Sequence, residues 1–373
     1  MSATVLRGGR LLDPKGGVDR EADLVLREGR IAELLAPGQP CGDLETLDVK
    51  GLWVMPGFID LRCVLKDATD LSAALEGGYT TVVCSADSEA VVSPWVRVLR
   101  AAALSKHLEG EELGEVPADA VCLCNGSRPI VRGGLMRRAL QYSRPLKIPV
   151  MVHSEDPSLS GRGVLGEGFV ATWLGLPSVP PSAEVSVVAR DLALLEEQGG
   201  RLHFSHLTCA GSVRLLKDAQ SRGLAVSADV TPHHLTMTDE AARGYAIEAR
   251  VWPPLRPASD VAALVAAVKD GTIEAVASDH HRIDPVEREH PFDQCTPGID
   301  SLAHAFRRVG ALGLEPLVLA RLFSSGPAAI LKLDGGCLLA NARADLTIVD
   351  PTHPCVRYTV IGGEVRFTRE TGT

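Results

Sequence analysis

The hydrophobic positions along the chain follow two different patterns. Residues 1–54 and 335–373 contain short apolar runs separated by glycine and proline turns, which is typical of small β-strands. Between them, apolar runs of strand length alternate with amphipathic helical stretches such as Ala183–Gln198 and Ser212–Arg222. The apolar runs are Thr80–Cys84, Ala120–Cys124, Pro149–His153, Arg201–His206, Ala225–Asp229 and Ile273–Asp279. The middle section therefore predicts repeated βα units and a parallel sheet.

These repeated units predict an α/β fold. About eight such units close a barrel of roughly 250 residues, so residues 55–334 are expected to form a (β/α)8 barrel of the TIM type. The two β-rich ends, 1–54 and 335–373, are expected to pair into one small β-sandwich domain, because the termini of domains often lie close together.

Composition and charge narrow the possible functions. The chain has 373 residues, of which 45% are hydrophobic, and a formal net charge of −9, which argues against bulk nucleic-acid binding. No apolar run reaches the roughly 18 residues of a membrane span, and the N-terminus lacks the apolar segment of a secretion signal. Nine scattered cysteines are interpreted as reduced thiols. The sequence thus predicts a cytoplasmic protein with no membrane or nucleic-acid partner.

Three polar residues lie where predicted strands end, at the face of a barrel that carries the chemistry. They are His153, His206 and Asp279. Imidazole and carboxylate groups of this kind suit zinc. A single histidine at a strand end is more often a hydrogen-bonded core residue, but three strand ends that repeat the pattern favour a shared metal site.

The motifs around these residues resemble those of dihydroorotases, in the amidohydrolase superfamily. Pro56–Asp60 resembles the start of the family's first metal motif, and the blocks after it follow in the family's order over about nine-tenths of the chain. These blocks begin at His153, His206, Thr231, Arg250, Ser278 and Gly335.

The resemblance implies a barrel plus β-sandwich fold and a reaction class, the reversible, zinc-assisted ring closure of carbamoyl aspartate to dihydroorotate. It implies that His153, His206 and Asp279 hold metal, and that Asp279 is the catalytic residue that transfers the proton. The implied substrate contacts are Lys66, Asp87, His233 and Arg250.

Several positions depart from the family pattern. Arg62 and Val64 stand where the family has two metal-binding histidines, and neither replaces an imidazole. Lys66 stands where the family has an arginine that grips the substrate carboxylate, and it lacks the bidentate fork. The stretch that should supply a carboxylate between two metals, Cys124–Ser127, contains none. Ile283 replaces a histidine that is expected on the substrate.

Two hypotheses follow from these departures. The favoured one is a non-catalytic subunit, like the inactive family members that assemble with aspartate carbamoyltransferase in pyrimidine biosynthesis. Such a chain is expected in a homo- or hetero-oligomer and binds at most one zinc ion, weakly, or none. The alternative is an active cyclic amidohydrolase that works with a single metal ion, which the retained His153, His206 and Asp279 favour.

Arg62 is the departure with the clearest physical consequence. Loss of the first metal leaves Asp279 as a carboxylate in a partly dry pocket, where an uncompensated charge is costly. Arg62 is placed across the barrel end from Asp279 and is permanently charged. We therefore predict that Arg62 pairs with Asp279 and replaces the metal charge. In the alternative arrangement, Arg62 points to solvent and Asp279 is held by His153, His206 or water.

Overall fold

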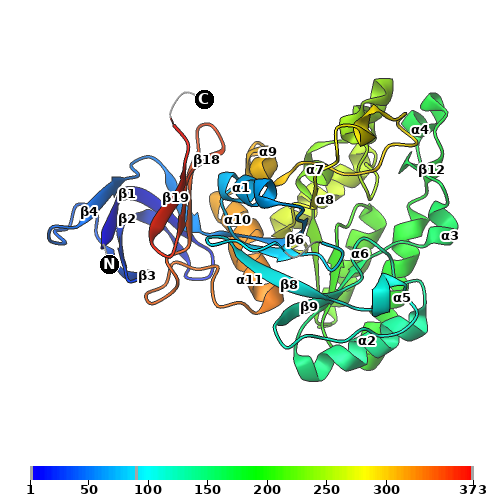
Figure 1. Ribbon diagram of the computed structural model, residues 1–373, viewed down its shortest axis with the longest axis horizontal. Helices are drawn as coiled ribbons and strands as arrows, with labels where there is room; N and C mark the ends of the chain where they lie inside the picture. Colours follow the sequence, from blue (N-terminus) through cyan, green and yellow to red (C-terminus); the bar gives the residue numbers. More distant parts are fainter. Residues whose placement is uncertain (1–2, 89–90, 371–373) are drawn as a thin grey trace.

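The computed structural model describes residues 3–88 and 91–370, and it has two parts, each built on its own sheet (Figure 1). The small part contains strands from both chain ends, and the larger part contains the strands and helices between them.

The small part is an eight-stranded sheet in which the two chain ends meet. Strand β5 pairs antiparallel with β17, so strands from the N-terminal and C-terminal segments form one continuous sheet. The predicted limits of the domains stay a prediction. Its apolar residues form their own cluster. The strands are β1 (Thr4–Asp13), β2 (Val18–Arg27), β3 (Arg30–Leu35), β4 (Glu45–Asp48), β5 (Trp53–Pro56), β17 (Leu346–Asp350), β18 (Cys355–Ile361) and β19 (Glu364–Thr368).

The larger part is a parallel sheet that closes on itself, which confirms the predicted TIM-type barrel. Two short strands that follow each other in the chain, β15 and β16, close the barrel. Strand β15 pairs with β14, and β16 pairs with β6. The strands are β6 (Phe58–Val64), β7 (Tyr79–Cys84), β8 (Arg97–Ala103), β9 (Ala120–Cys124), β10 (Val150–His153), β13 (Leu202–Ser205), β14 (Val226–Val230), β15 (Ala275–Val276) and β16 (His280–His281).

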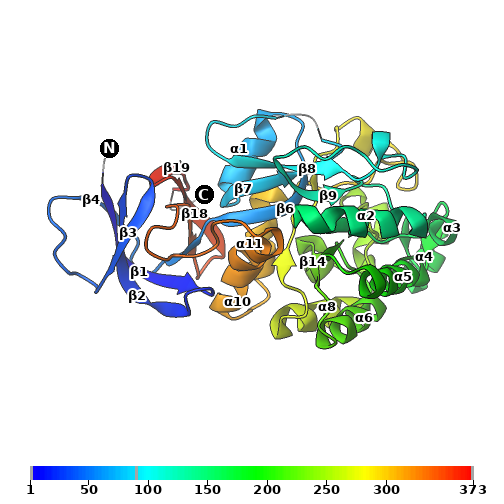
Figure 2. The same ribbon diagram turned by 90° about the horizontal axis from the view of Figure 1, so that it is seen from below.

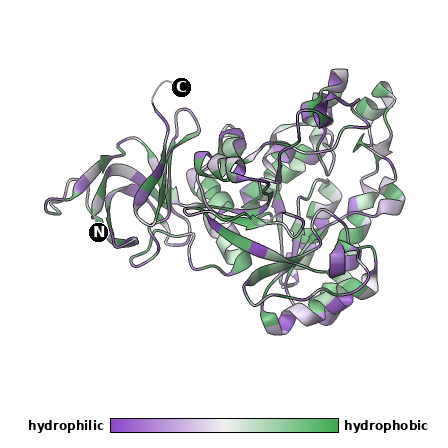
Figure 3. Cartoon of the chain, viewed as in Figure 1, coloured by the Kyte–Doolittle hydropathy of each residue, from purple (hydrophilic) through white to green (hydrophobic). Residues whose placement is uncertain are grey.

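Helices cover the outside of the barrel and carry both hydrophobic and hydrophilic residues (Figure 3). Helix α1 begins at Asp67, whose side chain accepts a hydrogen bond from the Thr69 N–H, an N-terminal cap of the usual kind. The helices are α1 (Ala68–Glu76), α2 (Gly133–Leu146), α3 (Pro157–Ser160), α4 (Phe169–Leu174), α5 (Ser182–Gln198), α6 (Ala210–Ser221), α7 (Pro232–Thr236), α8 (Ala258–Asp270), α9 (Ala305–Gly310), α10 (Pro316–Ala320) and α11 (Gly326–Leu331).

Two short strands, β11 (Leu165–Gly166) and β12 (Ser178–Val179), pair with each other beside α4. In the described residues, no helix is long and apolar enough to cross a membrane.

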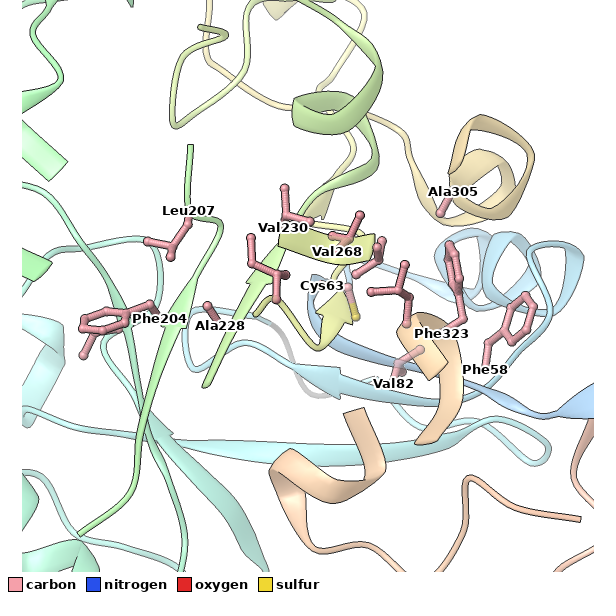
Figure 4. Packing of buried hydrophobic residues seen from close by; sticks show 14 of the residues in the cluster. Phe58, Cys63, Val82, Phe204, Leu207, Ala228, Val230, Val268, Ala305 and Phe323 are labelled. Carbon is pink, nitrogen blue, oxygen red and sulfur yellow. The ribbon is translucent and has the colours of Figure 1, made fainter. Parts of the chain in front are cut away.

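The junction between the two parts is filled by aromatic residues. Phe58, at the start of β6, lies 5.0 Å from Phe323 and 5.2 Å from Phe306, measured between ring centroids. Figure 4 shows Phe58 and Phe323 at one end of a continuous apolar cluster that extends to Phe204 on β13. Burial of several such rings anchors the first barrel strand against the C-terminal helices.

Candidate active site

The site lies where the last barrel strand is interrupted. Asp279 stands between β15 and β16 and has a positive φ of 47°, which is uncommon for a residue other than glycine. The preceding residue, Ser278, is fixed because its N–H and Oγ both donate to the buried carboxylate of Asp60, each at 2.6 Å. The interruption therefore presents the Asp279 carboxylate at the C-terminal end of the barrel.

Arg62 forms the predicted ion pair with Asp279. Its Nε lies 3.4 Å from Asp279 Oδ1, and the two side chains are only 12% and 15% exposed. Arg62 also donates to the Gly126 carbonyl at 3.2 Å and to Ser127 Oγ at 2.8 Å. Burial alone would lower the pKa of Arg62, but Asp279 and Asp87 outweigh it and raise that pKa above its ordinary value. The guanidinium is thus held inside the barrel end, in contact with the carboxylate.

His206 also contacts the Asp279 carboxylate. It ends β13 with a positive φ of 56°, and its Nε2 lies 3.3 Å from Asp279 Oδ1. Its Nδ1 lies 2.9 Å from Asp229, a buried carboxylate that also contacts His203 at 2.8 Å. Burial would lower the pKa of His206, but Asp279 and Asp229 raise it above its ordinary value. The result is a chain of charges that runs from Arg62 through Asp279 and His206 to Asp229.

His153 has a different partner. Its Nε2 lies 2.8 Å from Glu155 Oε2, and the same oxygen accepts a hydrogen bond from Trp252 Nε1 at 2.9 Å. Burial would raise the pKa of Glu155, but the His153 contact keeps it below its ordinary value. One ring nitrogen of His153, Nε2, is therefore already engaged by a carboxylate.

The expected metal ligands do not form one site. Among residues 3–88 and 91–370, no group of three or more histidine, cysteine, aspartate or glutamate side chains is arranged to hold a metal ion. Of the three predicted ligands, His206 and Asp279 lie within 3.3 Å of each other, whereas His153 contacts Glu155 and the Arg62 cation stands against Asp279. Their role as metal ligands stays a prediction. The donor set does not fit a zinc ion, because zinc sites need three or four ligands around one point.

Two of the expected substrate-binding residues have other contacts. The Lys66 ammonium donates to the Arg282 carbonyl at 2.6 Å. Asp87 accepts hydrogen bonds from Ser127, from its N–H and its Oγ, both at 2.9 Å. Asp87 thus fixes the loop that also binds Arg62, and it supplies a second negative charge near the guanidinium.

The other two, His233 and Arg250, are buried. His233 is completely buried, and neither of its ring nitrogens has a hydrogen-bond partner among the described residues. Burial lowers its pKa well below the ordinary value, so the ring is neutral. Arg250 is 8% exposed and lies 5.9 Å from the Trp252 ring centroid. The assignment of Lys66, Asp87, His233 and Arg250 to substrate binding stays a prediction.

Two cavities beside His153 are small. A cavity whose walls include Arg62, Cys124 and His153 has a volume of about 10 Å³. A second cavity, beside Glu155 and Trp252, also has about 10 Å³. Binding sites for small organic molecules usually measure roughly 300–1,000 Å³. Neither cavity accommodates a dihydroorotate-sized molecule in this arrangement.

Sequence reasoning missed the acidic partners of the site. Glu155 follows His153 by two residues, and Asp229 lies next to last in β14, the neighbour of β13, so both positions were visible in the sequence. What the sequence did not reveal is that each carboxylate turns toward its histidine rather than toward solvent or a metal.

The comparisons with known proteins agree with this fold and these motifs. The amidohydrolase family pattern matches residues 188–366. A dihydroorotase of Anaeromyxobacter dehalogenans (strain 2CP-C) is 40% identical over 381 residues, covering 92% of this chain and 88% of the relative. A dihydroorotase of Pelotomaculum thermopropionicum is 39% identical, with 93% and 88% covered. The chain is a dihydroorotase-like member of the amidohydrolase superfamily.

Solved structures support the same fold for this dihydroorotase-like chain. A D-hydantoinase superposes with a TM-score of 0.80 at 19% identity, covering 97% of this chain and 95% of the other. A dihydropyrimidinase from Brevibacillus agri superposes with a TM-score of 0.79 at 18% identity, covering 97% and 94%. At these identities the similarity concerns the fold alone.

Proposed function

We propose that this dihydroorotase-like chain is a non-catalytic member of its family, which supports an aspartate carbamoyltransferase in cytoplasmic pyrimidine biosynthesis. The observation that carries the proposal is the Arg62–Asp279 ion pair, at 3.4 Å and largely buried. A permanent cation now neutralises the carboxylate that a catalytic zinc ion would neutralise.

Two further features support the loss of activity. Two cavities beside His153 measure only about 10 Å³ each, too small for a substrate. Lys66 donates one of its ammonium hydrogens to the Arg282 carbonyl, and it lacks the bidentate fork of an arginine. The partner part of the proposal rests on the resemblance to inactive family members that assemble with a carbamoyltransferase.

A turnover assay tests the catalytic part. Purified protein supplied with zinc is expected to hydrolyse dihydroorotate no faster than buffer does, and His153→Ala is expected to change nothing. The exposed residue His353 offers a matched control, His353→Ala. Turnover that disappears in His153→Ala but persists in His353→Ala overturns the proposal.

A binding assay tests the partner part. The aspartate carbamoyltransferase of the same cell, mixed with this chain, is expected to elute with it as one complex in size-exclusion chromatography. Separate elution at micromolar concentrations of both proteins contradicts the supporting role.

An active, single-metal amidohydrolase is the second candidate. One observation favours it: His206 and Asp279 keep uncommon backbone angles, with φ of 56° and 47°, and stay within 3.3 Å of each other. Strained residues of this kind often belong to working sites. In this reading Arg62 would move aside and His206 and Asp279 would hold the metal ion, and the turnover assay separates the two candidates.

A further inference from the structure

A large cavity lies at the opposite end of the barrel from Arg62 and Asp279. Its volume is about 740 Å³, within the range of small-molecule sites. It is lined by residues at or just before the starts of four neighbouring strands, namely Pro149, Arg201, Ala225 and Glu274, and by α11 and the turn before it. Figure 2 shows α10 and α11 between the small sheet and the barrel, and Lys15 of the small sheet completes the wall.

The charge of this cavity is opposite to that of the protein. Its lining contains four cationic side chains and a single carboxylate, although the whole chain has a net charge of −9. The cationic residues are Lys15, Arg201, Arg321 and Lys332, and the carboxylate belongs to Glu274. A concave surface of one sign attracts and concentrates small ions of the opposite sign.

The two arginines lack acidic partners. Among residues 3–88 and 91–370, neither Arg201 nor Arg321 has a carboxylate within ion-pair distance. Their hydrogen bonds go to backbone carbonyls instead: Arg201 donates to Ile330 at 2.5 Å, and Arg321 donates to Val268 at 2.5 Å. Burial lowers the pKa of both groups, and for Arg321 the nearby charges of Glu274 and Asp270 only partly oppose this effect.

Two buried polar atoms in the wall are unsatisfied. Arg321 Nε and Glu274 Oε2 have no hydrogen-bond partner among the described residues. Buried donors and acceptors are normally paired, so these two atoms, which are covered within residues of the cavity wall, leave Arg321 and Glu274 without a complete set of partners. Apolar side chains, including Leu202, Val226 and Leu333, form the rest of the wall.

We propose that this cavity binds a small organic anion, with a carboxylate or phosphate group held by Arg321, Lys15 and Lys332 and an apolar part held against the barrel base. The proposal is independent of whether the other end of the barrel is catalytic. A chain without catalysis would then still carry a ligand site, placed between the barrel and the small sheet.

Calorimetric titration with two simple probes tests the proposal. Phenyl phosphate and benzoate share an aromatic body and differ in the anionic group, and benzyl alcohol is the neutral control. At least one anion is expected to bind with millimolar or tighter affinity, while benzyl alcohol does not. Preference for phenyl phosphate assigns the site to phosphate esters, and preference for benzoate assigns it to carboxylates.

Charge variants locate the binding. The double variant Lys15→Gln/Lys332→Gln is expected to weaken binding by at least about fivefold. Glu274→Gln, which removes the carboxylate from the cavity lining, is expected to tighten binding by about threefold. Matched controls at exposed positions elsewhere, Lys50→Gln/Lys269→Gln and Glu248→Gln, are expected to leave affinity unchanged.

Opposite effects of the lysine and glutamate variants would be difficult to obtain from a general change in stability. The absence of binding by both anions, equal binding of benzyl alcohol, or equal effects of the site and control variants would overturn the proposal.

Discussion

At the scale of single residues, Arg62 shows how one side chain changes the electrostatics of a site. Asp279 is a partly buried carboxylate, and it contacts Arg62 at 3.4 Å and His206 at 3.3 Å. Both contacts bring positive charge or polar N–H groups to it, as a metal ion would. The ion pair was predictable from the sequence because the barrel fixes where both strands end. The sequence did not predict that Arg62 would face Asp279 with its Nε. This orientation depends on the loop at Gly126 and Ser127, which binds the two terminal nitrogens of the guanidinium.

Removal of the guanidinium should therefore be costly. We expect Arg62→Ala to lower the free energy of unfolding by roughly 3–5 kcal/mol, because it strands a partly buried carboxylate. Denaturant unfolding measures the effect, with Arg20→Ala, at an exposed position, as the control. Arg62→Ala/Asp279→Asn should recover part of the loss, since asparagine tolerates a positive φ and carries no charge. An unchanged midpoint in Arg62→Ala means that Asp279 does not depend on this cation.

A second buried carboxylate gives a prediction about pH. Asp191, on α5, is completely buried, and its Oδ2 has no hydrogen-bond partner among the described residues. Burial raises its pKa to about 6, against the opposing effect of Arg190. Because the folded-state pKa lies above the unfolded value, this group's contribution to stability is full below about pH 4 and is lost as pH rises through about 6.

Asp191→Asn removes that dependence. Its unfolding free energy relative to the natural protein should rise between pH 4 and pH 7 by up to roughly 2–3 kcal/mol, since one pKa unit corresponds to about 1.4 kcal/mol. Urea unfolding at several pH values measures the difference, and Asp43→Asn at an exposed position controls for the loss of charge. A difference that is constant with pH contradicts the raised pKa.

At the scale of elements, the sequence pattern predicted strands best where they contain a continuous apolar run. Strand β9 was predicted with its observed limits, Ala120–Cys124, and β7 and β10 within one residue at their starts. Strand β8, Arg97–Ala103, was missed because it is mostly half-exposed and rich in alanine and arginine, so it has no apolar run. The predicted strand Ile273–Asp279 is instead two short strands, because the backbone turns to a positive φ at Asp279.

Close approaches between elements make some glycines sensitive to substitution. At Gly77, which ends α1, an added methyl group would meet the carbonyl oxygen of Leu302. We expect Gly77→Ala to destabilise the fold by about 1–3 kcal/mol, as overpacking does. Gly134, within α2, has open space around it, so Gly134→Ala should be neutral or stabilise by up to about 1 kcal/mol. Thermal unfolding of both variants checks the contrast, and an equal effect at both sites contradicts the packing at Gly77.

At the scale of the whole molecule, the resemblance to dihydroorotases fixed the fold and the order of the motifs, and the 40% identical relative agrees with it. The state of the site could not be read from the motifs. Glu155 engages His153 and the cavities beside it measure about 10 Å³, whereas a cavity of about 740 Å³ opens at the opposite end. Cavity volumes depend on how side chains from distant segments pack, which local sequence patterns do not specify.

The central claim is that the Arg62 cation takes the place of a metal ion. Elemental analysis of the purified, dialysed protein tests it most directly. The account predicts at most one zinc ion per chain, weakly held and lost on dialysis, because Arg62 and Glu155 engage the groups that would bind it. Two tightly held metal ions per chain would contradict the account.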